Sequence, residues 1–393
     1  MSYAERALEM HRKNRGKIET RSKVPLNSQQ DLSVAYTPGV AAPCLAIHEN
    51  VEEAYQLTCK ANSVAVVTDG SAVLGLGNIG PEAALPVMEG KALLFKQFGG
   101  IDAWPICLST QDPEEIIETV RRIAPGFGGI NLEDISAPRC FQIEERLQDL
   151  GIPVFHDDQH GTAIAVLAAL FNASQVVGKP LSEMRMVVSG AGAAGVAIGQ
   201  LLCGVYEGTE RFAGDLILCD SKGVVSSKRP DLNPAKVAAL QWSNLDDIGG
   251  GLRDALVGAD VFIGVSKANL LTGEDVKTMR PKPIILGMAN PVPEIMPDEA
   301  KAAGAAVVAT GRSDFPNQVN NVLVFPGIFR GLLDAGARRV EKRTFVAAAR
   351  AIAAVCGEPT PERVIPNVFD PGCDVAGAVA KAVVEELSLA TVQ

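Results

Sequence analysis

The chain has 393 residues, 47% of them hydrophobic, and a formal net charge of −10 at pH 7. A chain of this length and composition is expected to form two domains, each with a buried core. The negative charge argues against a nucleic acid or an anionic membrane as the partner, because both attract basic surfaces. These values favour a soluble globular protein.

Eight cysteines lie singly along the chain without a C-x-x-C pair, which is typical of reduced thiols in the cytoplasm. The charged N-terminus has no apolar segment of the kind found in a signal peptide. The longest apolar stretch, near Thr162 to Phe171, is too short to span a bilayer. We therefore expect a cytoplasmic location.

In the first part of the chain, short apolar runs alternate with longer helical patterns. After an N-terminal helix, strands are expected at residues 63–69, 101–108, 128–134 and 152–158, with helices at 81–98, 112–123 and 136–151. This alternation predicts a parallel sheet. In such sheets, ligands bind beyond the carboxyl ends of the strands.

A second alternating series follows a connecting helix at residues 161–183. Its strands are expected at 184–190, 215–220, 259–264, 283–290 and 305–310, and residues 329–393 are helical and Ala-rich. The fold class is therefore α/β, with a parallel N-terminal domain at 1–160 and a Rossmann-like, doubly wound domain with C-terminal helices at 161–393.

Two segments fit the dinucleotide-binding pattern G-x-G-x-x-G. GLGNIG, from Gly75, is followed at once by Pro81, and a tight turn explains it better. GAGAAG directly follows an apolar run and opens an Ala-rich helix, and the next strand ends in Asp220, which would accept the ribose hydroxyls. A βαβ unit without cofactor is the alternative. The predicted cofactor site consists of Gly190, Gly192, Ala193, Ala194, Gly195 and Asp220.

The sequence leaves the choice between NAD and NADP open. Asp220 favours NAD, because its charge would repel a 2′-phosphate. Residues just beyond it can hold that phosphate instead, or can simply form a solvated loop. They are Ser221, Lys222, Lys228 and Arg229.

The segment VFHDDQHGTA, residues 154–163, raises the possibility of a zinc site. His156 and His160 are four residues apart, as in zinc-protease helices. Such a site needs one helix through both histidines, whereas the preceding IPVF favours a strand. The chain has only four histidines, so a third ligand would have to be a carboxylate. We therefore disfavour zinc.

Carboxylates offer another metal site. Glu133 and Asp134 follow one predicted strand, and Asp157 and Asp158 follow the next, so that all four can meet in one crevice. Clustered carboxylates repel one another unless a cation lies between them, and oxygen ligands select Mg²⁺ or Mn²⁺. Alternatively, Glu133 and Asp134 cap a helix that begins at Ser136.

Two further residues are candidates for proton transfer. Lys91 lies on the apolar stripe of its helix, where burial would lower its pKa, whereas Lys96 is less clearly on that stripe. A lysine stem that reaches out to solvent is equally compatible with this position. Tyr36, before a Thr-Pro-Gly turn, is ambiguous by itself.

Taken together, these segments resemble the malic enzymes of the short bacterial type. The resemblance runs from about Tyr3 to the C-terminal helices and is carried by the motifs AYTPGVA, VTDGSAVLGLGNIG, MEGKALLFKQFGGIDA, GGINLEDI, VFHDDQHGTA, VVSGAGAAG, GMANPVPE and NQVNNVLVFPGIFRG. It implies oxidative decarboxylation of L-malate to pyruvate and CO₂, with NAD or NADP and Mg²⁺ or Mn²⁺ as cofactors. The first domain would bind substrate and metal, and the second NAD(P).

The resemblance also implies residue roles. Glu133, Asp134 and Asp158 would be the metal ligands, and Asp157 would shape the acid–base site beside them. A second group acts on the substrate: Lys91 and Tyr36 as the proton-transfer pair, and Asn290 and Asn320 as ligands of the malate carboxylate, with Asn290 close to the nicotinamide.

One position departs from the pattern of the larger malic enzymes. Where they carry an arginine that binds substrate, this chain has Ala72. We expect a backbone amide near GLGNIG to bind the malate carboxylate in its place. Substitution of Gly77 by Val should then raise KM for malate more than KM for NAD(P).

Two other functions are compatible with parts of the sequence. One is a metal-independent amino-acid dehydrogenase of similar build, against which the paired carboxylates argue. The other is a non-catalytic nucleotide-binding sensor. By resemblance the chain is expected to form a homodimer, in which residues of the N-terminal segment complete the neighbour's site.

Overall fold

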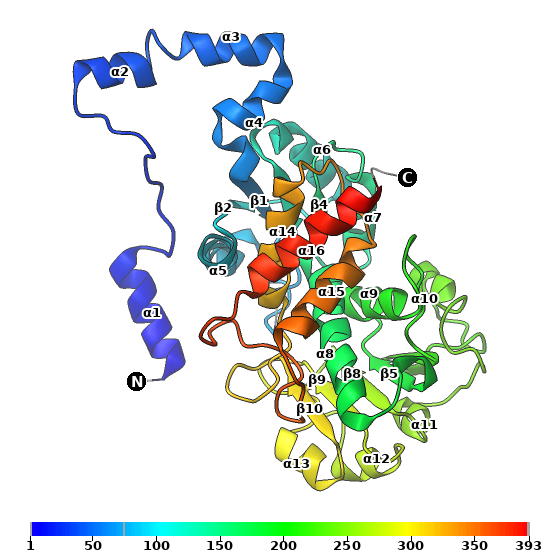
Figure 1. Cartoon of the computed structure of the whole chain (residues 1–393). Coiled ribbons are helices and arrows are strands. Elements are labelled where there is room, and N and C mark those ends of the chain that lie inside the picture. Colours follow the sequence, from blue (N-terminus) through cyan, green and yellow to red (C-terminus); the bar gives the residue numbers. More distant parts are fainter. Residues whose placement is uncertain (1, 74, 391–393) are drawn as a thin grey trace.

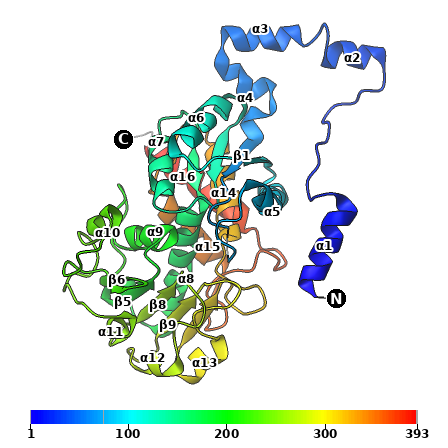
Figure 2. The same cartoon turned by 180° about the vertical axis from the view of Figure 1, so that it is seen from behind.

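The computed structural model describes residues 2–73 and 75–390. Two β-sheets with their helices form the body, and an N-terminal arm, residues 2–50, extends away from it (Figure 1). Seen from behind, the arm again stands clear of the body along most of its length (Figure 2). The predicted α/β class with two parallel sheets is confirmed.

The first sheet is parallel throughout, with the strand order β2-β1-β3-β4. The strand order reverses between β1 and β3, and such a reversal opens a crevice at the carboxyl ends of the strands. Its strands are β1 (Ser63–Thr68), β2 (Asp102–Cys107), β3 (Gly129–Leu132) and β4 (Val154–His156), and its helices are α5 (Pro81–Gly99), α6 (Pro113–Ile123) and α7 (Arg139–Arg146).

The second sheet has the order β10-β9-β8-β5-β6-β7, in which only the short β7 is antiparallel. With β5 counted first, this is the 3-2-1-4-5-6 order of dinucleotide-binding sheets. Its strands are β5 (Arg185–Ser189), β6 (Asp215–Asp220), β7 (Gly223–Val224), β8 (Val261–Gly264), β9 (Ile284–Gly287) and β10 (Val307–Thr310). Its helices are α9 (Ala193–Leu202), α10 (Pro234–Ala239), α11 (Leu252–Leu256), α12 (Gly273–Lys277) and α13 (Pro297–Ala302).

Helices between the two sheets join them into one body. The π-helical turn η4 (Asp157–Gly161) leads into α8 (Thr162–Val177), and α14 (Phe325–Asp334), α15 (Thr344–Val355) and α16 (Val375–Ala390) complete this layer. Phe95 of α5 packs edge-on against Phe325 and Phe329 of α14. The C-terminal helices therefore pack against the first sheet's helix as well as against α8, although they follow the second sheet in sequence.

The central helix is longer than the apolar run in the sequence suggested. Residues Asp157–Val177 form one helical stretch that is long and apolar enough, by length and composition, to cross a membrane, and 67% of its apolar window is buried inside the protein. Burial of this extent is typical of a core helix in a two-sheet α/β protein. The expectation that this stretch is too short was therefore wrong.

The N-terminal arm contains α1 (Tyr3–Asn14), α2 (Gln29–Ala35) and α3 (Ala41–Glu49), none of which buries a residue. Leu32, Val34 and Leu45 are exposed along it. The arm contacts α5 through Lys17, whose amide donates to Glu89. Short helical turns η1 (Val51–Glu53), α4 (Ala54–Leu57) and η2 (Cys59–Asn62) then lead into β1.

Candidate active site

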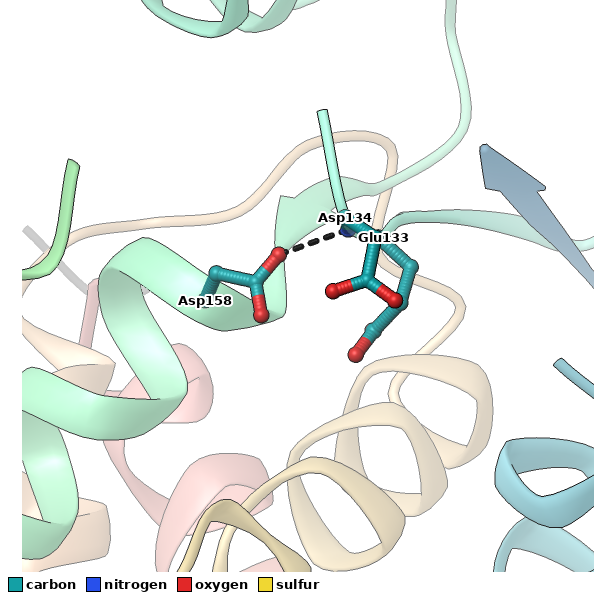
Figure 3. Close-up of side chains that lie close together, drawn as sticks. All are labelled: Glu133, Asp134 and Asp158. Carbon is teal, nitrogen blue, oxygen red and sulfur yellow. Dashed lines mark hydrogen bonds between the residues drawn. The ribbon is translucent and has the colours of Figure 1, made fainter. Parts of the chain in front are cut away.

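Three carboxylates meet at the carboxyl ends of β3 and β4. Glu133 and Asp134 come directly after β3, and Asp158 lies in η4 directly after β4. One oxygen of each lies within 4.8 Å of an oxygen of both others, and Figure 3 shows the three side chains around one common space. The parallel register of β3 and β4 produces this convergence, as the sequence predicted.

The backbone around Asp134 is shaped by the site. Asp134 has a positive φ of 53°, which is unusual for a residue other than glycine. Its amide donates to Asp158 Oδ2 at 2.7 Å, and its carbonyl accepts from Ala72. Helix α7 begins only at Arg139, without a side-chain cap. The alternative that Glu133 and Asp134 cap a helix from Ser136 is therefore wrong.

The charge balance of this cluster favours a cation. Burial, and then mutual repulsion, raise the pKa of Asp134, and burial is also the largest cause that raises the pKa of Glu133 and Asp158. Asp134 Oδ2 is buried and has no hydrogen-bond partner among the described residues. An oxygen-only, anionic donor set of this kind suits Mg²⁺ or Mn²⁺.

Lys91 reaches the same cluster from α5. It is 7% exposed, and its Nζ lies 2.6 Å from Asp157 Oδ2 and 2.9 Å from Glu133 Oε1. Its ammonium also lies over the ring of Phe325. The apolar stripe thus placed Lys91 correctly inside the protein, and the stem does not reach out to solvent.

The predicted direction of the Lys91 pKa was wrong. Burial by itself disfavours the ammonium, but Asp157 and Glu133 outweigh it and raise the pKa above its ordinary value. The sequence stripe showed that the lysine is buried but could not show which charges surround it. Lys96, by contrast, lies near the surface and pairs with Asp102.

The zinc site is excluded by the local fold. His156 ends β4 and is the N-cap of η4, so that no helix runs through both histidines. His160 instead forms a buried cluster with Glu144 and Lys342. Burial lowers the pKa of both histidines to about 4 and so favours their neutral forms.

Tyr36 does not lie near Lys91 of the same chain. It ends α2 in the N-terminal arm and is 66% exposed. In Figure 1, α2 lies well apart from α5, which carries Lys91. The predicted proton-transfer pair is therefore not formed within one copy of the chain.

The two predicted asparagines follow the second sheet. Asn290 lies after β9, where its carbonyl is 3.2 Å from the position that a Cβ on Gly75 would take. Asn320 caps the turn η6 (Asn321–Leu323) by accepting from Val322. The turn that contains GLGNIG thus lies close to both segments: Ala72, just before it, donates to Asp134 O, and Gly75 approaches Asn290 O.

Asn321, the residue after Asn320, was not among the site residues predicted from the sequence. Burial raises the pKa of Asp157 to about 7, and the hydrogen bond with Asn321 is among the contacts that oppose this rise. A Cβ at Gly161 would lie 2.0 Å from Asp157 Oδ1 and 3.1 Å from Asn321 Cβ, so glycine is required where these side chains meet. The VNN doublet was the available signal, and only its first asparagine was chosen.

The glycine loop after β5 has the geometry expected of a dinucleotide site. Gly190 has a φ of 120°, and a Cβ on Gly195 would lie 1.7 Å from Gly190 O, so both are needed for the turn. A Cβ on Gly192 would meet no described atom within 4 Å. In dinucleotide-binding folds the pyrophosphate approaches the backbone on such an open side, and here Ala193 and Ala194 begin α9 directly after Gly192.

Asp220 ends β6 beside this loop, since the amide of Gly190 donates to Cys219 O. Although burial opposes it, hydrogen bonds from Arg229 and Lys236 lower the pKa of Asp220 to about 2. Lys228 turns away and donates to Asp247 O.

Comparison with known proteins identifies the family. Residues 15–114 and 110–148 match the malic enzyme N-terminal domain, and residues 159–388 match the malic enzyme NAD binding domain. The chain belongs to the malic enzyme family. It is 56% identical over 98% of its length to the bifunctional malic/malolactic enzyme of Bacillus subtilis, covering 92% of that protein, and 54% identical over 94% to the NAD-dependent malic enzyme of Geobacillus stearothermophilus, covering 76%.

A solved structure supports the same assignment. The NAD-dependent malic enzyme of Thermotoga maritima superimposes with a TM-score of 0.91 at 49% identity, covering 96% of this chain and 98% of the other. Both NAD-dependent and NADP-dependent malic enzymes are among the relatives. The malic enzyme family thus accounts for both sheets.

Proposed function

We propose that this malic enzyme converts L-malate to pyruvate and CO₂ while reducing NAD⁺ or NADP⁺, and that the crevice described above is its active site. The observation that carries the proposal is the convergence of Glu133, Asp134 and Asp158 with Lys91 beside them. Helix α9, which begins at the nucleotide loop, packs against η4, which carries Asp158. Substrate, metal and nicotinamide sites would therefore adjoin.

Glu133, Asp134 and Asp158 would hold Mg²⁺ or Mn²⁺, and the unpartnered Asp134 Oδ2 is suited to face such an ion. When bound, a divalent cation stabilises negative charge on the substrate oxygen in both the oxidation and the decarboxylation, and the nicotinamide accepts the hydride. Asn290 and Asn320 would bind the malate carboxylate near the nicotinamide.

Lys91 would move the proton. As a base, its amine takes the proton of the C2 hydroxyl while hydride leaves C2; as an acid, its ammonium supplies the proton that reaches C3 after loss of CO₂. Its raised pKa suits the acid step. For the base step the amine of Lys91 must be neutral. The negative charges of Glu133 and Asp157, which contact its Nζ and favour the ammonium, must then be balanced by positive charge.

Tyr36 would act from a second copy of the chain. Its arm buries no residue in helices α1 to α3 and exposes Leu32, Val34 and Leu45, an apolar surface that a homodimer would cover. We propose that the arm reaches across the dimer and brings Tyr36 to Lys91 of the partner. The described cysteines are all free, which suits a cytoplasmic location.

The test is an assay of purified protein with L-malate and Mn²⁺, run separately with NAD⁺ and NADP⁺. NADH or NADPH should form together with an equal amount of pyruvate, and EDTA should abolish both. Reduction that persists in EDTA would point to a metal-independent dehydrogenase. Accumulation of oxaloacetate in place of pyruvate would contradict the assignment of the carboxylates to the decarboxylation step.

A further inference from the structure

Glu294, in the GMANPVPE motif, places a carboxylate between the ends of two strands. Its side chain is fully buried. Oε1 accepts from the amide of Ser266 at 3.1 Å, and Oε2 accepts from the amide of Ala289 at 3.0 Å. Ser266 follows β8 and Ala289 follows β9, which are parallel neighbours. One side chain therefore joins the two loops that leave the carboxyl ends of these strands.

The strand ends leave room for this side chain. A Cβ on Gly264, the last residue of β8, would lie 2.2 Å from Glu294 Cδ, so only glycine fits there. A Cβ on Gly287, the last residue of β9, would lie 3.5 Å from Glu294 Oε2. The amide of Leu271 donates to Glu294 O and fixes the backbone. The position of the carboxylate is therefore set by the chain around it.

A carboxylate suits this position because it offers two acceptors. Burial raises the pKa of Glu294, and the hydrogen bonds from Ala289 and Ser266 oppose this rise. A glutamine of the same size has one acceptor and one donor group, so that it would turn an N–H group toward one of the two amides. A buried N–H group without an acceptor is costly. The carboxylate thus determines where both loops lie.

Both loops adjoin the proposed cofactor and substrate site. On the β8 side, the carbonyl of Val265, just before Ser266, is 2.7 Å from the position that a Cβ on Gly190 would take. On the β9 side, Ala289 directly precedes Asn290. β8 and β9 belong to the second mononucleotide-binding half of the sheet, and the glycine loop belongs to the first. The nicotinamide is therefore expected at the carboxyl ends of β8 and β9.

We propose that Glu294 is a positioning residue for the nicotinamide. It fixes the loop beside Gly190 relative to the loop that carries Asn290, and so sets the separation of the nicotinamide ring and malate. It acts through these loops and contacts neither ligand. The inference rests on the proposed function and names a residue that arranges the same site. A small shift of either loop should slow hydride transfer, because the rate depends steeply on the geometry of the reacting atoms.

The experiment compares full-length wild type with Glu294→Gln. ADP-ribose and NADH, which differ only in the nicotinamide, are titrated by calorimetry without malate or metal; if NADP⁺ proves to be the cofactor, their 2′-phosphorylated forms replace them. Glu294→Gln should bind NADH about tenfold more weakly than wild type does, and ADP-ribose within about twofold, because the glycine loop is unchanged. With saturating L-malate and Mn²⁺, kcat should fall about 10- to 100-fold.

Two further variants and one measurement on wild type support the comparison. Glu299→Gln on α13 is the matched control: Glu299 also accepts from a backbone amide, that of Gly273 at 2.7 Å, and its loss should change none of these values. Glu294→Asp keeps both acceptors on a shorter side chain and should show the same selective loss to a smaller extent, also where the glutamine variant does not fold. In wild type, residues 265–271 should be protected from hydrogen exchange before NADH is added.

Three results would overturn the inference. Equal weakening of NADH and ADP-ribose by Glu294→Gln would show a general effect on the domain, unchanged NADH binding and kcat would show that the loops keep their places without the carboxylate, and protection of residues 265–271 only with NADH would show that Glu294 does not fix them. A wild type that binds NADH but does not oxidise malate would contradict the proposed function alone, since the binding measurements still test Glu294. An active wild type whose Glu294→Gln variant behaves like Glu299→Gln would contradict only the role of Glu294.

Discussion

At the scale of single residues, the environment of Lys91 is set by two carboxylates, Asp157 and Glu133, that contact its Nζ. Lys91 was predicted to be buried from its helical stripe, and it is. Its pKa direction depends on Asp157 and Glu133, which are 66 and 42 residues away in the chain and reach it only through the tertiary fold. The partners of Asp220 were hidden for the same reason, since Lys236 lies on α10, outside the loop that the sequence analysis considered.

The role of Lys91 can be tested against a matched lysine on the same helix. Lys91→Met should lower kcat by about 10²- to 10⁴-fold, the usual contribution of a positioned acid or base. Lys96→Met should change kcat by less than about twofold, because Lys96 forms only a surface ion pair with Asp102. Steady-state kinetics at saturating malate and Mn²⁺ measure both. Equal losses in the two variants would show a general effect on the helix and contradict the assignment.

At the scale of elements, strand ends and the turns after them build the site. The pattern of parallel strands predicted that Glu133, Asp134, Asp157 and Asp158 could converge, because residues after neighbouring parallel strands share one edge. Three of these carboxylates meet, and Asp157 contacts Lys91 beside them. The π-helical turn η4 was not predictable, since no residue pattern distinguishes it from the α-helix that follows. The helix capping proposed for Glu133 and Asp134 also failed, because α7 begins three residues later than expected.

Metal binding should be visible in stability as well as in activity. Mn²⁺ at about 100 times its Kd should stabilise the folded protein by ~2.7 kcal/mol, measured as a rise in Tm. Because burial and mutual repulsion raise the pKa values of Asp134 and Asp158, protons compete with the metal. At one fixed Mn²⁺ concentration, the rise in Tm should therefore be larger at pH 8 than at pH 6.

The substitution Asp158→Asn tests whether Asp158 is a metal ligand or a carboxylate that only supports the fold. The substitution removes a negative charge from a buried acidic cluster, so Tm in EDTA should rise. The response to Mn²⁺ should disappear. A variant that loses stability in EDTA yet still responds to Mn²⁺ would show that Asp158 is structural and is not a ligand.

The turn after β1 is expected to bind the malate carboxylate in place of the arginine that the larger malic enzymes carry at the position of Ala72, and a substitution at Gly77 tests this. Gly77 has a φ of 76°, and its amide donates to Val73 O, while a Cβ there would meet no described atom within 4 Å. Gly77→Val should therefore act through backbone strain and move the amides next to Ala72 and Asn290. KM for malate should rise several-fold, with a smaller change in KM for NAD(P)⁺. An unchanged KM for malate would remove this turn from the substrate site.

At the scale of the whole molecule, the sequence predicted both sheets and their order along the chain but not where the two ends of the chain lie. The C-terminal helices return to α5, as Phe325 and Phe329 against Phe95 show. This contact joins residues more than 200 apart, and no local pattern encodes it. The N-terminal arm was predicted as a single helix, whereas it contains α1, α2 and α3 and buries none of them.

The distance between Tyr36 and Lys91 within one chain leads to a prediction about the dimer. If each site takes Tyr36 from one copy and Lys91 from the other, then Tyr36→Phe and Lys91→Met are each inactive, but a heterodimer of the two has one site with both native residues. The second site of that heterodimer carries both substitutions. In a statistical mixture half of the dimers are heterodimers, so activity should recover to about one quarter of wild type.

Co-expression of the two variants with different affinity tags, followed by sequential purification, isolates the heterodimer, which should then show about half of the wild-type kcat per dimer. A heterodimer of Tyr36→Phe with Lys96→Met controls for effects of the tags and of co-expression. One of its sites has both native residues and should be active, and the other carries only the Tyr36→Phe substitution and should be inactive. A purified heterodimer of Tyr36→Phe and Lys91→Met without activity would show that Tyr36 serves its own chain or takes no part in proton transfer. Recovery of activity would instead establish that the exposed arm completes the neighbouring active site, since no arrangement within one chain can combine two native residues that reside on different copies.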